Sequence, residues 1–143
     1  MKSIHNPLNQ VAQFMLIVLW IYAAFSKLLN YELSKNEMLN QVFPYPVALT
    51  LAWLIPAIEI LTALLILMPK ATYYGFWASL ILLISFTLYI ILGLFNLYPR
   101  MPCSCAGIIP ELSWSKHLLI NFFFLAITLI AIITNHRGKE KLA

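Results

Sequence analysis

The chain contains only two cysteines, Cys103 and Cys105, and a single serine separates them. A disulfide between them would close so short a loop that the chain-entropy relation gives it about 1.6 kcal/mol of stabilisation, against about 3 kcal/mol for a fifteen-residue loop. Two residues of extended chain also span roughly 6.6 Å, whereas the Cα atoms of a disulfide prefer about 5.5 to 6 Å. Such a bridge would be strained, and strained disulfides exchange readily. The pair therefore predicts thiol–disulfide exchange rather than a structural cross-link.

His117 follows this pair in the sequence, in the first turn of a helix that we expect to begin after Ser113. An imidazolium ring or a helix N-terminus beside a thiol favours the reactive thiolate. We predict that Cys103, Cys105 and His117 form the catalytic group, in which one thiolate attacks a disulfide and the other cysteine resolves the mixed disulfide. Which cysteine attacks first stays open. An interfacial His117 that binds water or lipid headgroups is the competing interpretation.

A second set of polar residues lies inside stretches that are otherwise apolar. Glu59 stands about twelve residues into an apolar run, hence roughly 18 Å along a helix and near the middle of a bilayer. An ionisable group at that depth is costly and by default indicates a functional site. Pro56, one turn earlier, removes an amide donor and frees a backbone carbonyl. The alternative is that Pro56 only bends the helix and that a protonated Glu59 donates to a neighbouring helix.

Two further residues complete this predicted intramembrane polar site, which consists of Lys27, Pro56, Glu59 and Asn121. Lys27, near the end of the first apolar run, either reaches inward to pair with Glu59 or extends towards lipid headgroups. Asn121 lies one helical turn after His117 on the same helix face, where an amide is typical of hydrogen bonding between membrane helices.

The composition places these residues in a membrane protein. The 143 residues are 62% hydrophobic and 10% charged, whereas soluble domains average about 45 to 50% apolar and about 25% charged residues. Apolar stretches near the length of about 20 residues that crosses a bilayer occur at residues 9–30, 47–68, 72–97 and 114–134. We predict an all-α membrane protein, a four-transmembrane-helix bundle in which residues 1–143 form one domain and a short extracytoplasmic loop carries the Cys-Ser-Cys segment.

The basic residues predict the orientation of this bundle, because Lys and Arg in loops favour the cytoplasmic side. An even number of spans places both termini on one side, with Lys2, Lys70, Arg137, Lys139 and Lys141, and leaves the other side with Lys27, Lys35, Arg100 and Lys116. The three basic residues in the C-terminal tail favour cytoplasmic termini in a bacterial-type inner membrane. The cysteine loop then faces outward, where thiols can be oxidised. Because the basic residues form no stripe, lipids rather than nucleic acid are the expected neighbours.

The chain resembles the MauE branch of the DoxX-like membrane proteins, in order and spacing, in the runs YAAFSKL (22–28), AWLIPAIEI (52–60), PCSCAG (102–107) and LSWSKH (112–117). Members of that family are four-helix integral membrane proteins, and the MauE branch is associated with methylamine utilisation. The resemblance implies a redox-associated protein that supports disulfide formation or electron transfer for an exported dehydrogenase. It also implies that Lys27, Glu59 and the cysteine loop are marked positions, and that the partner is an extracytoplasmic thioredoxin-like or substrate protein.

Three other interpretations stay open. The first is a quinone cofactor, by looser analogy with quinone-linked enzymes that generate disulfides. Those enzymes use a Cys-x-x-Cys pair and a second cysteine pair, whereas this chain has one pair with one intervening residue. No other cofactor is predicted. Met101, Cys103, Cys105 and His117 could instead form a soft-ligand site for Cu(I) in a metal-handling protein, although they do not match a structural zinc site. A membrane subunit or maturation scaffold without catalytic activity is the third interpretation.

Overall fold

The computed structural model describes residues 7–95, 97 and 114–140, and these residues form five helices and no strand. In chain order the helices are α1 (Pro7–Leu29), α2 (Tyr31–Leu39), α3 (Tyr45–Leu67), α4 (Thr72–Leu94) and α5 (Trp114–Glu140). Helices suit this sequence because a helix satisfies its backbone hydrogen bonds within one segment, as a span through lipid requires.

The four long helices are candidate membrane spans, over Pro7–Leu29, Tyr45–Leu67, Thr72–Leu94 and Ser115–His136. The predicted all-α fold with four such helices is therefore confirmed for the part of the chain that the structure describes. The predicted Cys-Ser-Cys loop lies outside the described residues. The assignment of residues 1–143 to one domain, with the span limits given above, stays a prediction.

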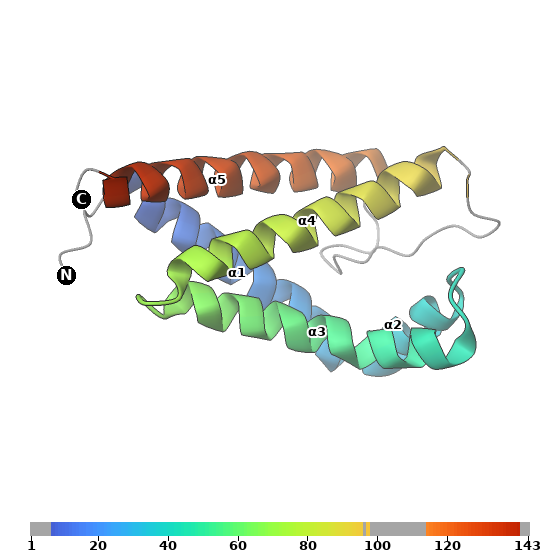
Figure 1. Ribbon diagram of the computed structural model, residues 1–143. Helices are drawn as coiled ribbons and strands as arrows, with labels where there is room; N and C mark the ends of the chain where they lie inside the picture. Colours follow the sequence, from blue (N-terminus) through green and yellow to red (C-terminus); the bar gives the residue numbers. More distant parts are fainter. Residues whose placement is uncertain (1–6, 96, 98–113, 141–143) are drawn as a thin grey trace.

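The long helices form an antiparallel bundle in which α1 and α4 each pack against both α3 and α5 (Figure 1). The start of α1 and the end of α5 lie at one end of this bundle, and α2 lies at the other, packed against α3 and α1 (Figure 1). We call the part that contains the start of α1 and the end of α5 the terminal half. The part that contains α2, the end of α4 and the start of α5 is the loop half.

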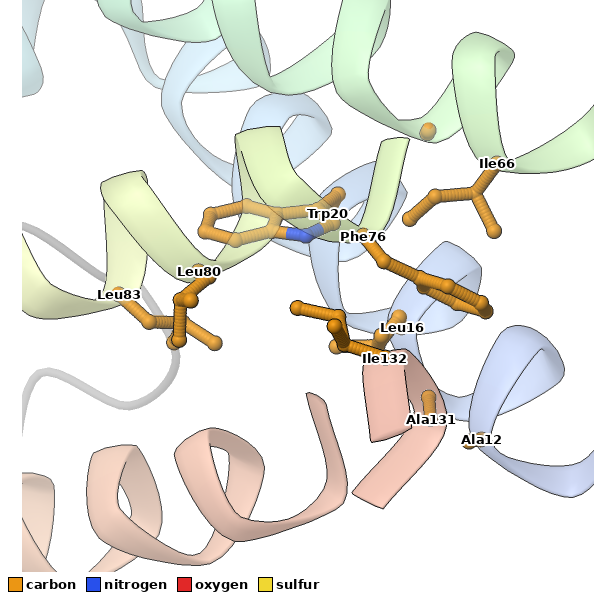
Figure 2. Packing of buried hydrophobic residues seen from close by; sticks show 10 residues of the cluster. Ala12, Leu16, Trp20, Ile66, Phe76, Leu80, Leu83, Ala131 and Ile132 are labelled. Carbon is orange, nitrogen blue, oxygen red and sulfur yellow. The ribbon is translucent and has the colours of Figure 1, made fainter. Parts of the chain in front are cut away.

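The terminal half has an apolar core (Figure 2). Trp20 of α1 and Phe76 of α4 are its largest fully buried side chains, at 2% and 1% exposure. The rest of this cluster is Ala12, Leu16, Ala63, Ile66, Leu80, Leu83, Ala131 and Ile132. Because lipid is as apolar as these side chains, the helices are held together by close packing and by hydrogen bonds between them.

Hydrogen bonds between helices set the register of this core. The Trp20 indole donates to Ser79 Oγ at 2.7 Å and links α1 to α4. Nearer the termini, Thr134 Oγ1 donates to Asn9 Oδ1 at 2.6 Å and links α5 to α1. Gln13 Nε2 donates to the backbone carbonyl of Ile66 at 2.7 Å and links α1 to α3. Each of the other three long helices is thus joined to α1 by a hydrogen bond at a defined height along the bundle.

The segment after α2 is held by α4. Tyr89 donates a hydrogen bond to Oε1 of the buried Gln41, and its ring stacks on Phe43 with centroids 6.2 Å apart. Met38 of α2 is buried with Ala48 and other residues of α3 in a second, smaller cluster. These contacts fix α2 and the following turn against the bundle.

Gly75 provides the close approach of α4 to α3, because a Cβ atom built there would lie 2.6 Å from both the backbone nitrogen and Cγ1 of Ile66. We predict that Gly75→Ala lowers the free energy of unfolding by about 1 to 3 kcal/mol, the usual cost of overpacking. Thermal unfolding in detergent measures this loss. Ser85→Ala, on the exposed face of α4, is the control, and an unchanged Tm for Gly75→Ala would contradict the prediction.

Candidate functional site

Glu59 is fully buried on α3, in a helix that contains Pro56 one turn before it. Small residues surround this part of the bundle: Ala23 and Ala24 of α1 and Ala52 of α3 are all buried. Small side chains let membrane helices approach closely. The sequence around Glu59 therefore allows α1 and α3 to pack tightly, and the carboxylate lies between helices rather than in lipid.

Lys27 of α1 pairs with Glu59, with its Nζ 2.8 Å from Oε1 of the carboxylate. The two side chains are 8% and 0% exposed. Side chains on a helix tilt towards its N-terminus, so in antiparallel α1 and α3 these two tilt towards one another along the bundle axis. Lys27 Nζ also lies 3.4 Å from the backbone carbonyl of Ala23. Of the two alternatives for Lys27, the structure shows the inward pairing with Glu59.

The pairing is electrostatically necessary in this environment. Burying one unpaired charge is far more costly than burying an ion pair, and a pair is favourable only when its other hydrogen-bonding atoms are also satisfied. Glu59 Oε2 is buried and has no hydrogen-bond partner among the described residues. The site therefore retains one unused acceptor on a carboxylate that is already held in place by Lys27.

Asn121 and His117 are both buried on α5, at 4% and 2% exposure, in the loop half of the bundle. His117 is thus a buried residue rather than a side chain exposed at the helix end. Asn121 Nδ2 has no hydrogen-bond partner in the described part of the chain, and no hydrogen bond there joins it to Lys27 or Glu59. The structure brings Lys27 and Glu59 together, with Pro56 adjacent, and places His117 and Asn121 on a separate helix.

The remaining predicted residues, Arg100, Met101, Cys103 and Cys105, lie outside the described residues. How the two thiols lie relative to His117 stays a prediction. Among the residues that the structure does describe, no group of three or more His, Cys, Asp or Glu side chains could hold a metal ion.

Sequence reasoning missed Thr87 of α4, which is buried at 4% exposure and whose Oγ1 has no hydrogen-bond partner among the residues described. Other buried threonines, such as Thr62 and Thr128, donate to the carbonyl four residues earlier, each at 2.8 Å. A threonine in an apolar run is usually satisfied in this way. No signal in the sequence distinguishes Thr87 from the other threonines, because only the tertiary structure shows that its hydroxyl has no hydrogen-bond partner among the described residues.

We predict that Lys27→Met and Glu59→Leu each lower the free energy of unfolding by about 3 to 5 kcal/mol, because each leaves a buried charge unpaired. The double variant should lose less than either single variant, since it removes both charges. Thermal unfolding in detergent tests this cycle. The matched control is the pair of half-buried Lys35 and exposed Glu32, which lie 4.0 Å apart and whose removal should cost no more than about 1 kcal/mol. Additive losses at positions 27 and 59 would contradict the prediction.

Comparison with known protein families identifies one family whose model matches this chain. A family model described as methylamine utilisation protein MauE matches residues 6–134, which include every residue of the predicted sites. No curated protein and no solved structure matches the chain. The family match covers most of the sequence, and four helices are long and apolar enough to cross a bilayer. The chain therefore belongs to the MauE family and is an integral membrane protein.

Proposed function

We propose that this protein supports an exported partner of methylamine utilisation by thiol–disulfide exchange through Cys103 and Cys105. The observation that carries this proposal is the position of the only two cysteines of the sequence. They are separated by one residue and lie in the sequence between α4 and α5, which are candidate membrane spans. Membership of the MauE family supports the link to methylamine utilisation. The strain expected of a Cys-x-Cys bridge supports exchange rather than a permanent cross-link.

The proposed exchange is balanced without a further reactant. A partner thiolate attacks one sulfur of the Cys103–Cys105 disulfide, and the other sulfur leaves as a thiolate. The second partner thiol then attacks the mixed disulfide, so that the partner gains a disulfide and this chain becomes a dithiol. Two electrons and two protons pass from the partner's thiols to those of the chain. The same steps in reverse describe electron flow in the other direction, from this chain to an oxidised thioredoxin-like partner.

In this proposal the helices position the reactive segment. Lys27 and Glu59 join α1 to α3, and Tyr89 and Phe43 hold the α2 end of the bundle to α4. His117, in the first turns of α5, contributes positive potential when protonated and so favours thiolate at the cysteines. The proposal includes the predicted orientation, with both termini in the cytoplasm and the cysteine segment on the outer side, where a thioredoxin-like partner would meet it.

The proposed topology predicts that a membrane-impermeant maleimide labels Cys103 or Cys105 in reduced, intact spheroplasts. The reagent reaches only thiols on the outer side, and the chain has no other cysteine that could react. Gel shift or mass spectrometry measures the labelled fraction. A control in ruptured membranes gives the maximum labelling, and labelling only after rupture would invert the orientation.

The exchange mechanism predicts that Cys103→Ser and Cys105→Ser each abolish transfer to a reduced exported substrate, because one remaining thiol cannot complete the cycle. Insertion and the Tm in detergent should be unchanged. The measurement is the redox state of the substrate, followed by alkylation and mass spectrometry. Full activity of the double variant would rule out exchange and favour a scaffold. Copper retained by the wild type after reducing purification, and lost with the cysteines, would favour the soft-metal alternative.

A further inference from the structure

The two apolar clusters of the bundle differ in the helices that build them. The larger cluster, which is the core of the terminal half, takes buried residues from α1, α3, α4 and α5. The smaller cluster, around Met38, Ala48 and Ala52, takes all its members from residues 31–55, which are α2, the turn after it and the first half of α3. In the part of the chain that the structure describes, α4 thus belongs to the larger cluster and not to the smaller one.

The first part of α4 is held firmly by the terminal half. Gly75 lets α4 come into close contact with Ile66 of α3, and Ser79 accepts the hydrogen bond of Trp20. Phe86 packs against the larger cluster, and its ring centroid lies 6.3 Å from that of Trp20. The core therefore holds α4 from its first turn as far as Phe86.

Tyr89, three residues beyond Phe86, connects α4 to the smaller cluster. Its hydroxyl donates a hydrogen bond to Oε1 of the buried Gln41. Its ring stacks on Phe43, which itself packs against the smaller cluster. At this end of the bundle α4 lies beside α5, and α2 lies beside α3 (Figure 1). Tyr89 therefore reaches from one pair of helices to the other.

The acceptor for Tyr89 is held in place by its own turn. Nε2 of Gln41 donates to the carbonyl of Glu37 at 3.2 Å, and the Gln41 backbone N–H donates to the carbonyl of Met38 at 3.1 Å. The amide oxygen is thus fixed where the tyrosine hydroxyl meets it. One such hydrogen bond typically shifts a conformational equilibrium by about two- to tenfold, so this contact can break and form again without unfolding the bundle.

We propose that the contact of Tyr89 with Gln41 and Phe43 is a strap that keeps the loop half closed. When the strap opens, the last two turns of α4 move away from the turn after α2, while the larger cluster keeps the terminal half packed. Proteins open locally where few apolar contacts are shared. Opening and closing of the strap involve no thiol and so do not depend on the exchange proposed above.

Distances between spin labels, measured by double electron–electron resonance, test the strap. The labels replace exposed Leu33 of α2 and exposed Leu94 of α4, in a chain whose two cysteines are changed to serine. Tyr89→Phe removes the hydroxyl and keeps the ring. We expect this variant to raise the fraction of a second, longer distance by about two- to tenfold, because the hydrogen bond to Gln41 is lost.

Two controls separate opening of the strap from general loosening. Labels at exposed Leu67 of α3 and Ile133 of α5 report on the terminal half, and Tyr89→Phe should leave their distance unchanged. Tyr74→Phe makes the same change on the exposed face of α4 and should alter neither pair. Unchanged distances between positions 33 and 94 in Tyr89→Phe, or equal broadening of both label pairs, would overturn the proposal.

Hydrogen exchange followed by mass spectrometry tests the same motion in chains that carry no label and keep both cysteines. In Tyr89→Phe, the backbone amides of residues 40–43 and 88–94 should exchange several-fold faster than in the wild type. The amides of residues 12–20, in the terminal half, should keep their rates. Unchanged exchange at residues 40–43 and 88–94, or equal acceleration along the whole chain, would contradict a local strap.

Discussion

Two opposite charges in the interior of a bundle that faces lipid must neutralise each other, and the pairing of Lys27 with Glu59 meets this requirement. The contact of 2.8 Å between Nζ and Oε1 favours one register of α1 against α3, because a change of one residue in the paired position moves the side chain by about 1.5 Å and turns it by about 100°. Together with the hydrogen bond of Gln13 to the Ile66 carbonyl, the ion pair defines how α1 lies against α3. In lipid, the ion pair specifies the arrangement of two helices better than the packing of Leu against Leu does. Lipid chains can replace an apolar contact, but they cannot replace the partner of a charge.

The buried side chains of the bundle also differ along its length. Towards the termini, Trp20 and Phe76 centre a close-packed apolar core, and the hydrogen bonds of Gln13 and Asn9 connect the helices at its edge. Beyond the bond between Trp20 and Ser79, the buried side chains are a mixture of polar ones, such as Lys27 and Asn121, and small apolar ones, such as Ala24. The close packing of the terminal half stabilises the bundle, which can therefore carry a costly buried ion pair further along its length.

This division is consistent with chemistry at the loop half. The two cysteines lie in sequence between α4 and α5, and the buried His117 and Asn121 lie on the α5 side of that connection. Thiol exchange moves protons as well as electrons, and His117 and Asn121 lie near the end of α5 that follows the thiols in the sequence.

The class of the protein, the positions of its polar residues and its family resemblance could all be read from the sequence. Four apolar stretches near the length of a bilayer span require helices, because only a helix satisfies the backbone within one segment of this kind. Glu59 stands out in the sequence because a carboxylate within an apolar span is energetically costly and by default indicates a functional site. The family match over residues 6–134 agrees with the resemblance in the runs around Lys27, Glu59 and the cysteines.

The partners of these residues were decided only by the tertiary structure. Lys27 could equally have extended to headgroups, and only the packing of α1 on α3 shows that its ammonium group meets Glu59. Thr87 gave no signal, since a threonine usually bonds within its own helix, and Trp20 gave no hint of Ser79 on a helix 59 residues away. The physical reason is that periodicity and hydropathy show which face of each helix meets lipid and which meets protein. A hydrogen bond between two helices depends instead on their relative height and rotation, and the packing of the whole bundle sets both.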